Sequence, residues 1–312
     1  MDERLPVVLG PTASGKTRLA VRLAARINGE IISADSRQVY RGMDIGTGKD
    51  LDDYEFEGQK IPYHLIDTVA AGERYNVYRY QHDFFEVFRD IRARGAIPVL
   101  CGGSGMYIEA VCRSFDMPQV AENKELRSSY EALSQQELVA ILQTYGPLHN
   151  TTDTQSRKRL IRAIEIAEYR SRCKSVVSNV DYPKIDPFIV GLSLPVEERR
   201  ARIDRRLEER LQNGMVEEAE RLMKEGLTLE DMIYYGLEYK YLALYLAKMM
   251  SFEEMKKQLQ IAIHQFAKRQ MTWFRGMERR GLQIHWVDVM GDESEVVNEL
   301  EKVISLCIKV KN

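Results

Sequence analysis

The segment from Gly10 to Thr17 constrains this chain more than any other feature. It reads G-P-T-A-S-G-K-T and lies between an apolar run, 5–9, and a helical pattern that begins at Leu19. A strand, a glycine-rich turn and a helix in this order direct several N–H groups at one anion. In such a loop Lys16 reaches the terminal phosphate, and the Thr17 hydroxyl holds Mg²⁺. A chance match in an ordinary loop is the alternative, and the surrounding pattern disfavours it. The predicted diphosphate-binding residues are Gly10, Pro11, Thr12, Ala13, Ser14, Gly15, Lys16 and Thr17.

Composition is typical of a globular protein of a reducing compartment. The chain has 312 residues, of which 44% are hydrophobic and 29% charged, and its net charge is −2. Any nucleic-acid binding must therefore come from local basic patches. No signal-like start and no apolar run of about 18 residues is visible, so we expect a cytoplasmic protein without membrane contact. The cysteines show no C-x-x-C pairing and are expected to be free or buried thiols: Cys101, Cys112, Cys173 and Cys307.

Short apolar runs alternate with helical stretches over the first 110 residues. This alternation predicts a parallel sheet covered by helices on both faces, an α/β fold with a P-loop NTPase-like core. Two later runs are expected to return to the same sheet. The predicted strands are 6–9, 30–33, 63–66, 97–101, 188–194 and 283–287.

The middle of the chain changes character. Residues 117–185 are polar with helical periodicity, as at Leu138, Ile141 and Leu142, and predict a helical insertion domain. The core is expected to comprise 1–116 and 186–312. Helices are predicted over 196–224, 229–249 and 252–277, the last with a buried stripe of Met255, Leu259, Ile263 and Phe266.

Carboxylates at strand ends help to separate phosphate-binding classes. The strand 97–101 ends in a glycine turn that contains Ser104, without the acidic residue that hydrolases use to hold Mg²⁺. Two other predicted strands end near Asp35 and Asp67. Asp35 would lie beside the phosphate loop, where it could act as a metal ligand, a helix cap or a general base.

Several longer motifs, in order along residues 5–277, resemble the tRNA dimethylallyltransferases, also called tRNA isopentenyltransferases. D-S-R-Q-V-Y after a phosphate loop is far more specific than the loop itself. The matching segments are 10–17, 32–40, 43–49, 102–108, 159–165, 214–218 and 267–275.

The resemblance implies a reaction and its catalytic residues. Dimethylallyl diphosphate would bind where kinases bind ATP. Its prenyl group would pass to the exocyclic amine of the adenosine 3′ of the anticodon, with release of pyrophosphate. Asp35 would be the general base, Ser104 would stand where the family usually has Thr, and Lys16 would stabilise the leaving group. Thr17 would hold Mg²⁺, and Arg206 would contact the diphosphate.

The resemblance also implies contacts with the tRNA anticodon stem-loop, which the insertion would grip. A basic helix such as 157–174 is otherwise most often a solvated face. The implied tRNA-binding residues are Asp35, Ser36, Arg37, Gln38, Ser104, Lys158, Arg159, Leu160, Ile161 and Arg162.

Some features depart from the family or are missing. The family often has a Gly-Tyr-Lys-Glu motif, and this chain reads Y-G-L-E-Y-K-Y at 235–241 instead. We therefore assign no contact of the family motif to this segment. No Cys/His pairing predicts a zinc finger. The histidines are scattered and predict no metal cluster: His64, His82, His149, His264 and His285.

Other functions remain open at this point. The nearest is an adenylate isopentenyltransferase, which prenylates free AMP, ADP or ATP. More distant are a small-molecule P-loop kinase and a non-catalytic RNA-binding protein. The expected partners are tRNA and dimethylallyl diphosphate, with the protein acting as a monomer.

Overall fold

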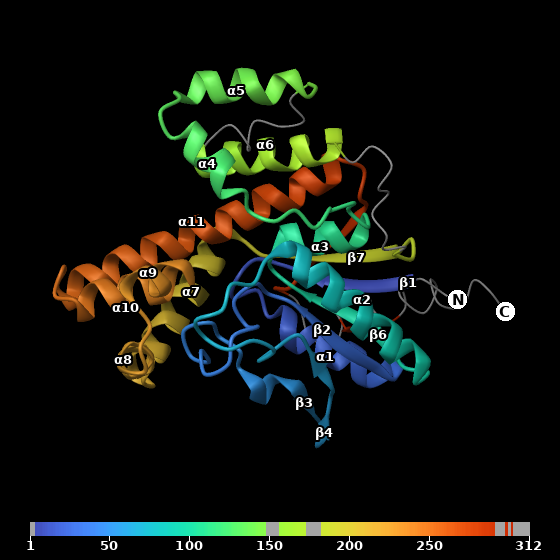
Figure 1. Cartoon of the computed structure of the whole chain (residues 1–312). Coiled ribbons are helices and arrows are strands. Elements are labelled where there is room, and N and C mark those ends of the chain that lie inside the picture. The colour runs from blue at the N-terminus through green and yellow to red at the C-terminus, as the bar shows by residue number, and fades with distance from the viewer. Residues whose placement is uncertain (1–3, 148–155, 173–181, 291–296, 299–300, 302–312) are drawn as a thin grey trace. The chain divides into compact units, whose positions relative to one another are not determined.

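A six-stranded parallel sheet forms the centre of the larger part of the chain (Figure 1). The computed structural model describes residues 4–147, 156–172, 182–290, 297–298 and 301. Cys173, Lys174, Cys307 and His149 lie outside these residues. The sheet strands are β1 (Arg4–Leu9), β2 (Gly29–Ala34), β5 (Tyr63–His64), β6 (Ile97–Gly102), β7 (Asp186–Ser193) and β8 (Ile284–Asp288). All six predicted strands are present, but the strand predicted over 63–66 ends at His64, because Leu65 adopts a positive φ of 61°.

The sheet order is β5-β2-β6-β1-β7-β8. The first strand, β1, is central and pairs with β6 and β7, as in the partners Val8 and Cys101 and the partners Val8 and Val190. The chain leaves β1 for β2 on one side and later returns to β7 on the other. Open parallel sheets bind ligands at the carboxyl ends of the strands where the order switches in this way. The phosphate loop follows β1 and therefore lies at this point.

Helices surround the sheet, and a small hairpin follows a 3₁₀ turn. The helices before the insertion are α1 (Lys16–Ile27), α2 (Val77–Ala93) and α3 (Gly105–Cys112). After it come α7 (Val196–Gln212), α8 (Met215–Lys224), α9 (Leu229–Tyr234), α10 (Leu237–Leu246) and α11 (Phe252–Arg279). The turn is η1 (Leu51–Tyr54), and the hairpin pairs β3 (Glu55–Phe56) with β4 (Gln59–Lys60); the sequence interpretation did not include either.

Two of the predicted helices are wrong in their extent. The predicted helix 196–224 is two helices, because Gly214 adopts φ 96° and begins α8. Likewise 229–249 is divided at Gly236, with φ 125°. A left-handed backbone conformation ends a right-handed helix, and glycine adopts it at little cost. The apolar spacing on both sides of each glycine concealed the break.

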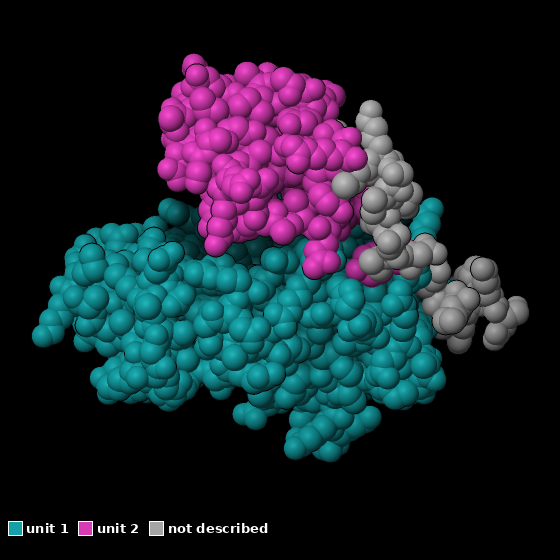
Figure 2. Space-filling view, viewed as in Figure 1, with its two compact units in different colours: residues 1–115, 183–312 teal, residues 116–182 magenta. Residues whose placement is uncertain are grey.

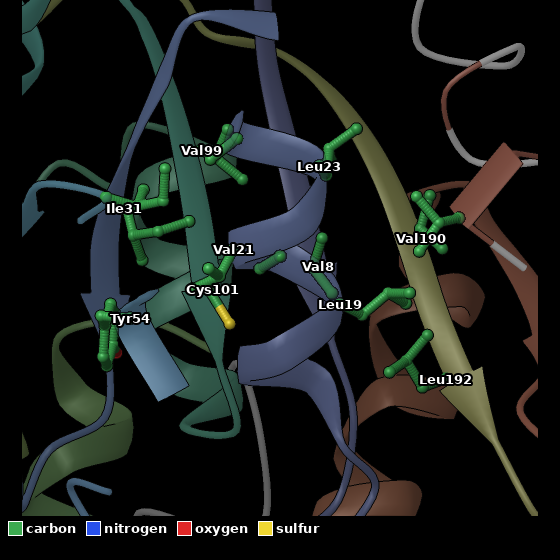
Figure 3. Packing of buried hydrophobic residues seen from close by; sticks show 14 of the residues in the cluster. Val8, Leu19, Val21, Leu23, Ile31, Tyr54, Val99, Cys101, Val190 and Leu192 are labelled. Carbon is green, nitrogen blue, oxygen red and sulfur yellow. The ribbon is translucent and has the colours of Figure 1, made fainter. Parts of the chain in front are cut away.

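The core lies between α1 and the sheet (Figure 3). Leu19 and Leu23 on α1 pack over apolar side chains of four strands. These strand side chains include Val8, Ile31, Val99, Cys101, Val190 and Leu192. Each fully buried leucine or valine contributes about 1.5–3 kcal/mol relative to exposure. This packing fixes the first turn of α1, and with it the phosphate loop, against the carboxyl end of the sheet.

The long helix α11 has the predicted buried stripe with one exception. Met255, Leu259 and Ile263 are buried, but Phe266 is 38% exposed. The stripe continues four residues after Ile263, through the fully buried Ala267, because a stripe on a straight helix drifts between three- and four-residue steps.

The chain divides into two compact units, shown in Figure 2: residues 1–115 with 183–312, and residues 116–182. The second unit covers nearly the same residues as the predicted insertion. Its helices are α4 (Lys124–Tyr130), α5 (Gln135–Thr144) and α6 (Arg157–Arg172), and its core is Leu138, Leu160 and Ile164. Of the helices described, none combines the length and apolarity that crossing a bilayer requires.

Candidate active site

The phosphate loop has the geometry of an anion cradle. Ala13 and Gly15 both have positive φ, 62° and 81°, and α1 begins directly afterwards at Lys16. No side chain caps this helix, so its first N–H groups remain available to a ligand. A turn with such left-handed backbone conformations directs successive N–H groups toward one centre. The Ser14 hydroxyl is buried there and has no hydrogen-bond partner among the described residues.

Gln270 joins the phosphate loop to a second turn. Its Oε1 accepts a hydrogen bond from the Thr12 N–H at 2.9 Å, and its Nε2 donates to the Gly103 carbonyl at 2.9 Å. The side chain comes from α11, far away in sequence, and is 8% exposed. The sequence interpretation placed Gln270 in a matching motif without assigning it a role. Its role here is to hold the two ligand-facing turns in register.

Asp35 and Ser104 lie at the ends of two adjacent strands, β2 and β6. The Ser104 hydroxyl accepts a hydrogen bond from the Ser36 N–H at 3.0 Å, and the Ser104 N–H donates to the Ala34 carbonyl at 3.1 Å. The Asp35 carboxylate accepts one hydrogen bond from the Arg37 N–H at 2.9 Å. This turn leaves Asp35 half-buried with its second oxygen uncommitted among the described residues.

Lys16 lies within electrostatic reach of Asp35 and Arg206. Burial lowers the pKa of Lys16, and the neighbouring Cys101 and Asp35 partly offset that effect. Across the described part of the chain, no hydrogen bond or ion pair engages the Lys16 ammonium. The structure therefore brings the predicted trio of Lys16, Asp35 and Ser104 together at one edge of the sheet.

Arg206, the predicted diphosphate contact on α7, faces the same edge. Its guanidinium donates to the Asp50 carboxylate and, at 3.4 Å, to the Gly48 carbonyl. Arg210 donates to the same Asp50 oxygen at 3.4 Å. Burial alone would raise the pKa of Asp50, but the two arginines hold it below its usual value.

The loop between β2 and η1 is held by two buried charged side chains. The Glu218 carboxylate accepts hydrogen bonds from the N–H groups of Asp44, Ile45 and Gly46 at 2.8–2.9 Å. The Lys49 ammonium, 1% exposed, donates to the carboxylates of Asp44 and Asp67 at 2.5 Å each. Asp67, one of the two strand-end carboxylates considered for metal binding, is thus paired with Lys49. The matching motifs at 43–49 and 214–218 are largely structural.

The segment 235–241, which departs from the family motif, supports this loop. Tyr239 donates to Glu218 at 2.6 Å, and Tyr235 packs edge-on against Tyr40 with ring centroids 4.6 Å apart. Glu238, between them, lies close enough to Arg210 and Asp35 to interact electrostatically with both.

The base-contacting segment 36–38 is partly occupied by protein contacts. Gln38 donates to the Gly48 carbonyl at 3.0 Å and accepts from the Ser33 hydroxyl at 3.1 Å. Arg37 lies over the Tyr234 ring, 5.6 Å from its centroid. Ser36 is half-buried, and its N–H is the group bonded to Ser104.

The basic helix α6 divides into structural and available side chains. Leu160 is fully buried and Ile161 packs on the same core, so their side chains support the helix. Arg162 donates to Glu165 at 3.0 Å and to the Val120 carbonyl at 2.8 Å. Lys158 and Arg159 are exposed, and their side chains pair with none of the residues described.

One group of side chains with metal-binding chemistry is found in the described residues, and it is not at the phosphate loop. His82, Asp83 and Glu86 lie near one another on α2, with His82 3.6 Å from Asp83 and 3.8 Å from Glu86. This group contains a single histidine; His82 and Glu86 are four residues apart and share a helix face, and Asp83 is the neighbour of His82 in the chain. Thr17, the predicted metal ligand, is the second residue of α1 and is half-buried.

The parallel sheet and the loop after its central strand define a P-loop-like α/β protein. A profile of the IPP transferase family matches residues 38–277. The chain is 54% identical over 297 residues to a Bacteroides fragilis protein named tRNA dimethylallyltransferase 2, covering 95% of this chain and 96% of that one. It therefore belongs to the IPP transferase family.

Solved structures agree with this assignment. The tRNA isopentenylpyrophosphate transferase of Bacillus halodurans superimposes with a TM-score of 0.70 at 30% identity, covering 97% of this chain and 96% of that one. A eukaryotic dimethylallyltransferase acting on tRNA has the same fold, with a TM-score of 0.76 at 21% identity, covering 97% and 80%.

Proposed function

We propose that this protein transfers the dimethylallyl group of dimethylallyl diphosphate to the N6 amine of the adenosine 3′ of the anticodon in tRNA. The observation that carries the proposal is the meeting of a cationic phosphate loop with the Asp35 carboxylate at one edge of the sheet. A kinase can use both groups as well, with the carboxylate accepting a hydroxyl proton, and the match to the IPP transferase family favours prenyl transfer. An alkyl transfer to a weakly nucleophilic amine is helped by both.

The bond changes balance within the two substrates. The C1–O bond to pyrophosphate breaks, and the bond between N6 and C1 forms. The amine loses one proton, which the uncommitted oxygen of Asp35 would accept. Accepting the N–H as a hydrogen bond first raises the electron density on N6. General-base help of this kind is typically worth about 10²–10⁴ in rate.

Negative charge grows on the leaving pyrophosphate. Lys16, Arg206 and the first N–H groups of α1 face the place where that charge would develop. Ser104 would bond the bridging oxygen in addition to its contact with Ser36. Preorganised donors stabilise the transition state more than the ground state, since the charge is larger there.

The loop residues fit a Mg²⁺ ion as cofactor. The buried Ser14 hydroxyl finds no partner in the part of the chain that the structure describes, and a phosphate or hydrated cation at this place would satisfy it. Thr17, at the start of α1, would hold the metal through its hydroxyl. When bound, Mg²⁺ supplies neutralising charge for the phosphate oxygens.

The acceptor side of the proposal rests on polar and basic groups, of which Lys158 and Arg159 are exposed and the others half-buried. Ser36, Arg37 and Gln38 follow Asp35 directly in the chain and would contact the target base, and Lys158, Arg159 and Arg162 would contact the phosphates of the anticodon stem. The target base must be turned out of its stack, at a cost of a few kcal/mol.

We place the enzyme in the cytoplasm, where the buried free thiols Cys101 and Cys112 stay reduced. We assign the activity to a monomer, because one chain supplies every group named.

One assay tests the proposal. The purified protein is incubated with Mg²⁺, labelled dimethylallyl diphosphate and either unmodified tRNA or AMP. Label in tRNA alone is the expected result. Label in AMP would instead support an adenylate isopentenyltransferase, and consumption of ATP without prenyl transfer would support a kinase. Binding of tRNA without any transfer would leave a non-catalytic RNA-binding role.

A further inference from the structure

Arg210 lies one helical turn after Arg206 on α7, and both side chains point to the same face. Residues four apart on a helix are neighbours on its surface. The side chain of Arg210 is 15% exposed and that of Arg206 is 30% exposed. Arg210 was not among the predicted site residues, because a charged residue in an arginine-rich helix carries no signal of its own.

Both guanidinium groups press against the backbone of Gly48. A Cβ atom added there would lie 1.7 Å from the Arg210 Nη2 and 2.7 Å from the Arg206 Nη2. Both groups also donate to the same oxygen of Asp50. They therefore lie side by side, and each is close enough to Lys16 to interact electrostatically with it.

Positive charge exceeds negative charge around Arg206, Arg210 and Lys16. Arg206 and Arg210 share one hydrogen-bonded carboxylate, and Lys16 has no ion-pair partner among the described residues. Holding several cations close together in a half-buried site costs free energy unless an anion balances their charge. The crowding is visible in the pKa of Arg210, which burial and the neighbouring Arg206 lower to about 10.

Three other carboxyl groups near these cations do not remove the surplus. Asp35 and Asp50 supply two negative charges against the three positive charges of Lys16, Arg206 and Arg210. Burial raises the pKa of Glu238 and, together with the neighbouring Asp50, that of Asp53, which disfavours their charged forms. A ligand that carries several negative charges matches this arrangement better than the protein's own acids do.

We propose that Arg210 is a second diphosphate-binding arginine, and that Asp50 orients both Arg210 and Arg206 toward the phosphate loop. This inference rests on the proposed function. A planar guanidinium binds two phosphate oxygens at once, and two such groups side by side match the two phosphates of a diphosphate. Arg210 would hold the donor and, as charge grows, the leaving pyrophosphate.

The test compares Arg210→Met with Arg205→Met, an exposed arginine on the same helix. The measurements are the KM for dimethylallyl diphosphate, the inhibition constant of inorganic pyrophosphate and the Kd for tRNA. We expect the first two to rise together in Arg210→Met by roughly 10- to 100-fold, as for loss of a charge-assisted, bidentate contact. The Kd for tRNA should stay within about twofold, because this contact is to the donor. Arg205→Met should behave as the wild type.

Two results would overturn the inference. One is unchanged pyrophosphate inhibition in Arg210→Met. The other is a loss of tRNA affinity and thermal stability with pyrophosphate affinity retained, which indicates a purely structural arginine. If Arg210→Met does not fold, Arg210→Lys replaces it, because lysine keeps the charge but lacks the two-pronged geometry of the guanidinium. Pyrophosphate should then bind roughly 3- to 10-fold more weakly than to the wild type. Unchanged pyrophosphate binding contradicts the inference.

Failure of the proposed function can be told apart from failure of this inference. If the wild type transfers no prenyl group to tRNA, the proposed function falls. Direct calorimetry of inorganic pyrophosphate with wild type, Arg210→Met and Asp50→Asn still decides the role of Arg210. Asp50→Asn should weaken pyrophosphate binding less than Arg210→Met, because it releases both arginines without removing either.

Discussion

The phenol of Tyr239 donates a 2.6 Å hydrogen bond to the carboxylate of Glu218, inside the structure that holds the loop 43–49. Tyr239 is 1% exposed, and Glu218 also receives three backbone N–H groups from that loop. The loop leads through Gly48 to Asp50, the carboxylate shared by the two arginines of α7. The contact between Tyr239 and Glu218 therefore supports the loop that leads to the proposed diphosphate site.

Tyr239→Phe should destabilise the protein by about 1.5–3 kcal/mol, because it removes one donor from a buried carboxylate. It should also raise the KM for dimethylallyl diphosphate, through displacement of the loop. Thermal unfolding and steady-state kinetics measure the two effects. Tyr241→Phe is the matched control, because the phenol of Tyr241 makes no hydrogen bond with the described residues. Equal stability of the two variants would show that the Tyr239 hydroxyl contributes nothing.

Asp35→Asn keeps an acceptor for the Arg37 N–H while removing the base. We expect kcat to fall by about 10²–10⁴, with the Kd for tRNA nearly unchanged. Single-turnover transfer and a filter-binding assay separate the two quantities. Asp186→Asn, an exposed carboxylate at the amino end of β7, is the control. Wild-type turnover in Asp35→Asn would exclude the base role.

The pH dependence of stability should contain a contribution from Glu30. Hydrogen bonds from Arg94 hold the pKa of Glu30 below its usual 4.5, and His64 contributes in the same direction. Burial of Glu30 acts in the opposite direction but is outweighed. The folded state thus favours the charged carboxylate. The resulting stability is fully present above about pH 5 and is lost as the pH falls through the lowered pKa.

Chemical denaturation between about pH 6 and pH 3 tests this assignment. The free energy of unfolding of Glu30→Gln should decline less steeply with acid than that of the wild type. Glu86→Gln, an exposed carboxylate on α2, should keep the wild-type slope. Parallel curves for wild type and Glu30→Gln would contradict the assignment.

The double variant Lys158→Ala/Arg159→Ala should weaken tRNA binding, because both side chains are exposed and unpaired among the described residues. The slope of log affinity against log salt should fall by roughly one to two, as expected when one or two phosphate contacts are lost. Arg172→Ala, on the same helix but paired with Glu168 at 2.6 Å, is the control. An unchanged slope would remove α6 from the tRNA interface.

The central strands could be predicted because β1, β6 and β7 contain apolar runs, which require burial on both faces. The outer strands β5 and β8 are less apolar and carry exposed side chains, as at Tyr63 and His285. The phosphate loop could be predicted because its function demands a fixed spacing of glycines around Lys16. The helix breaks at Gly214 and Gly236 could not, since apolar spacing continues across them and only the backbone φ shows the interruption. Phe266 was assigned to the core for a similar reason.

The candidate site was predictable where one residue lies next to a motif, as with Asp35 and Ser104. It was not predictable where distant segments meet. Gln270 reaches the phosphate loop from α11, and Asp50 meets α7 across about half the chain. Such pairings depend on how helices pack against the sheet, which local patterns do not encode.

The division of the core into two stretches has a consequence for biosynthesis. The central strand β1 is made first, yet its neighbour β7 is made only after the whole of residues 116–182. Until then one edge of β1 is open, and neither Arg206 and Arg210 on α7 nor Gln270 on α11 has been made. A nascent chain stalled within those residues would expose an unpaired sheet edge, the kind of surface that recruits chaperones.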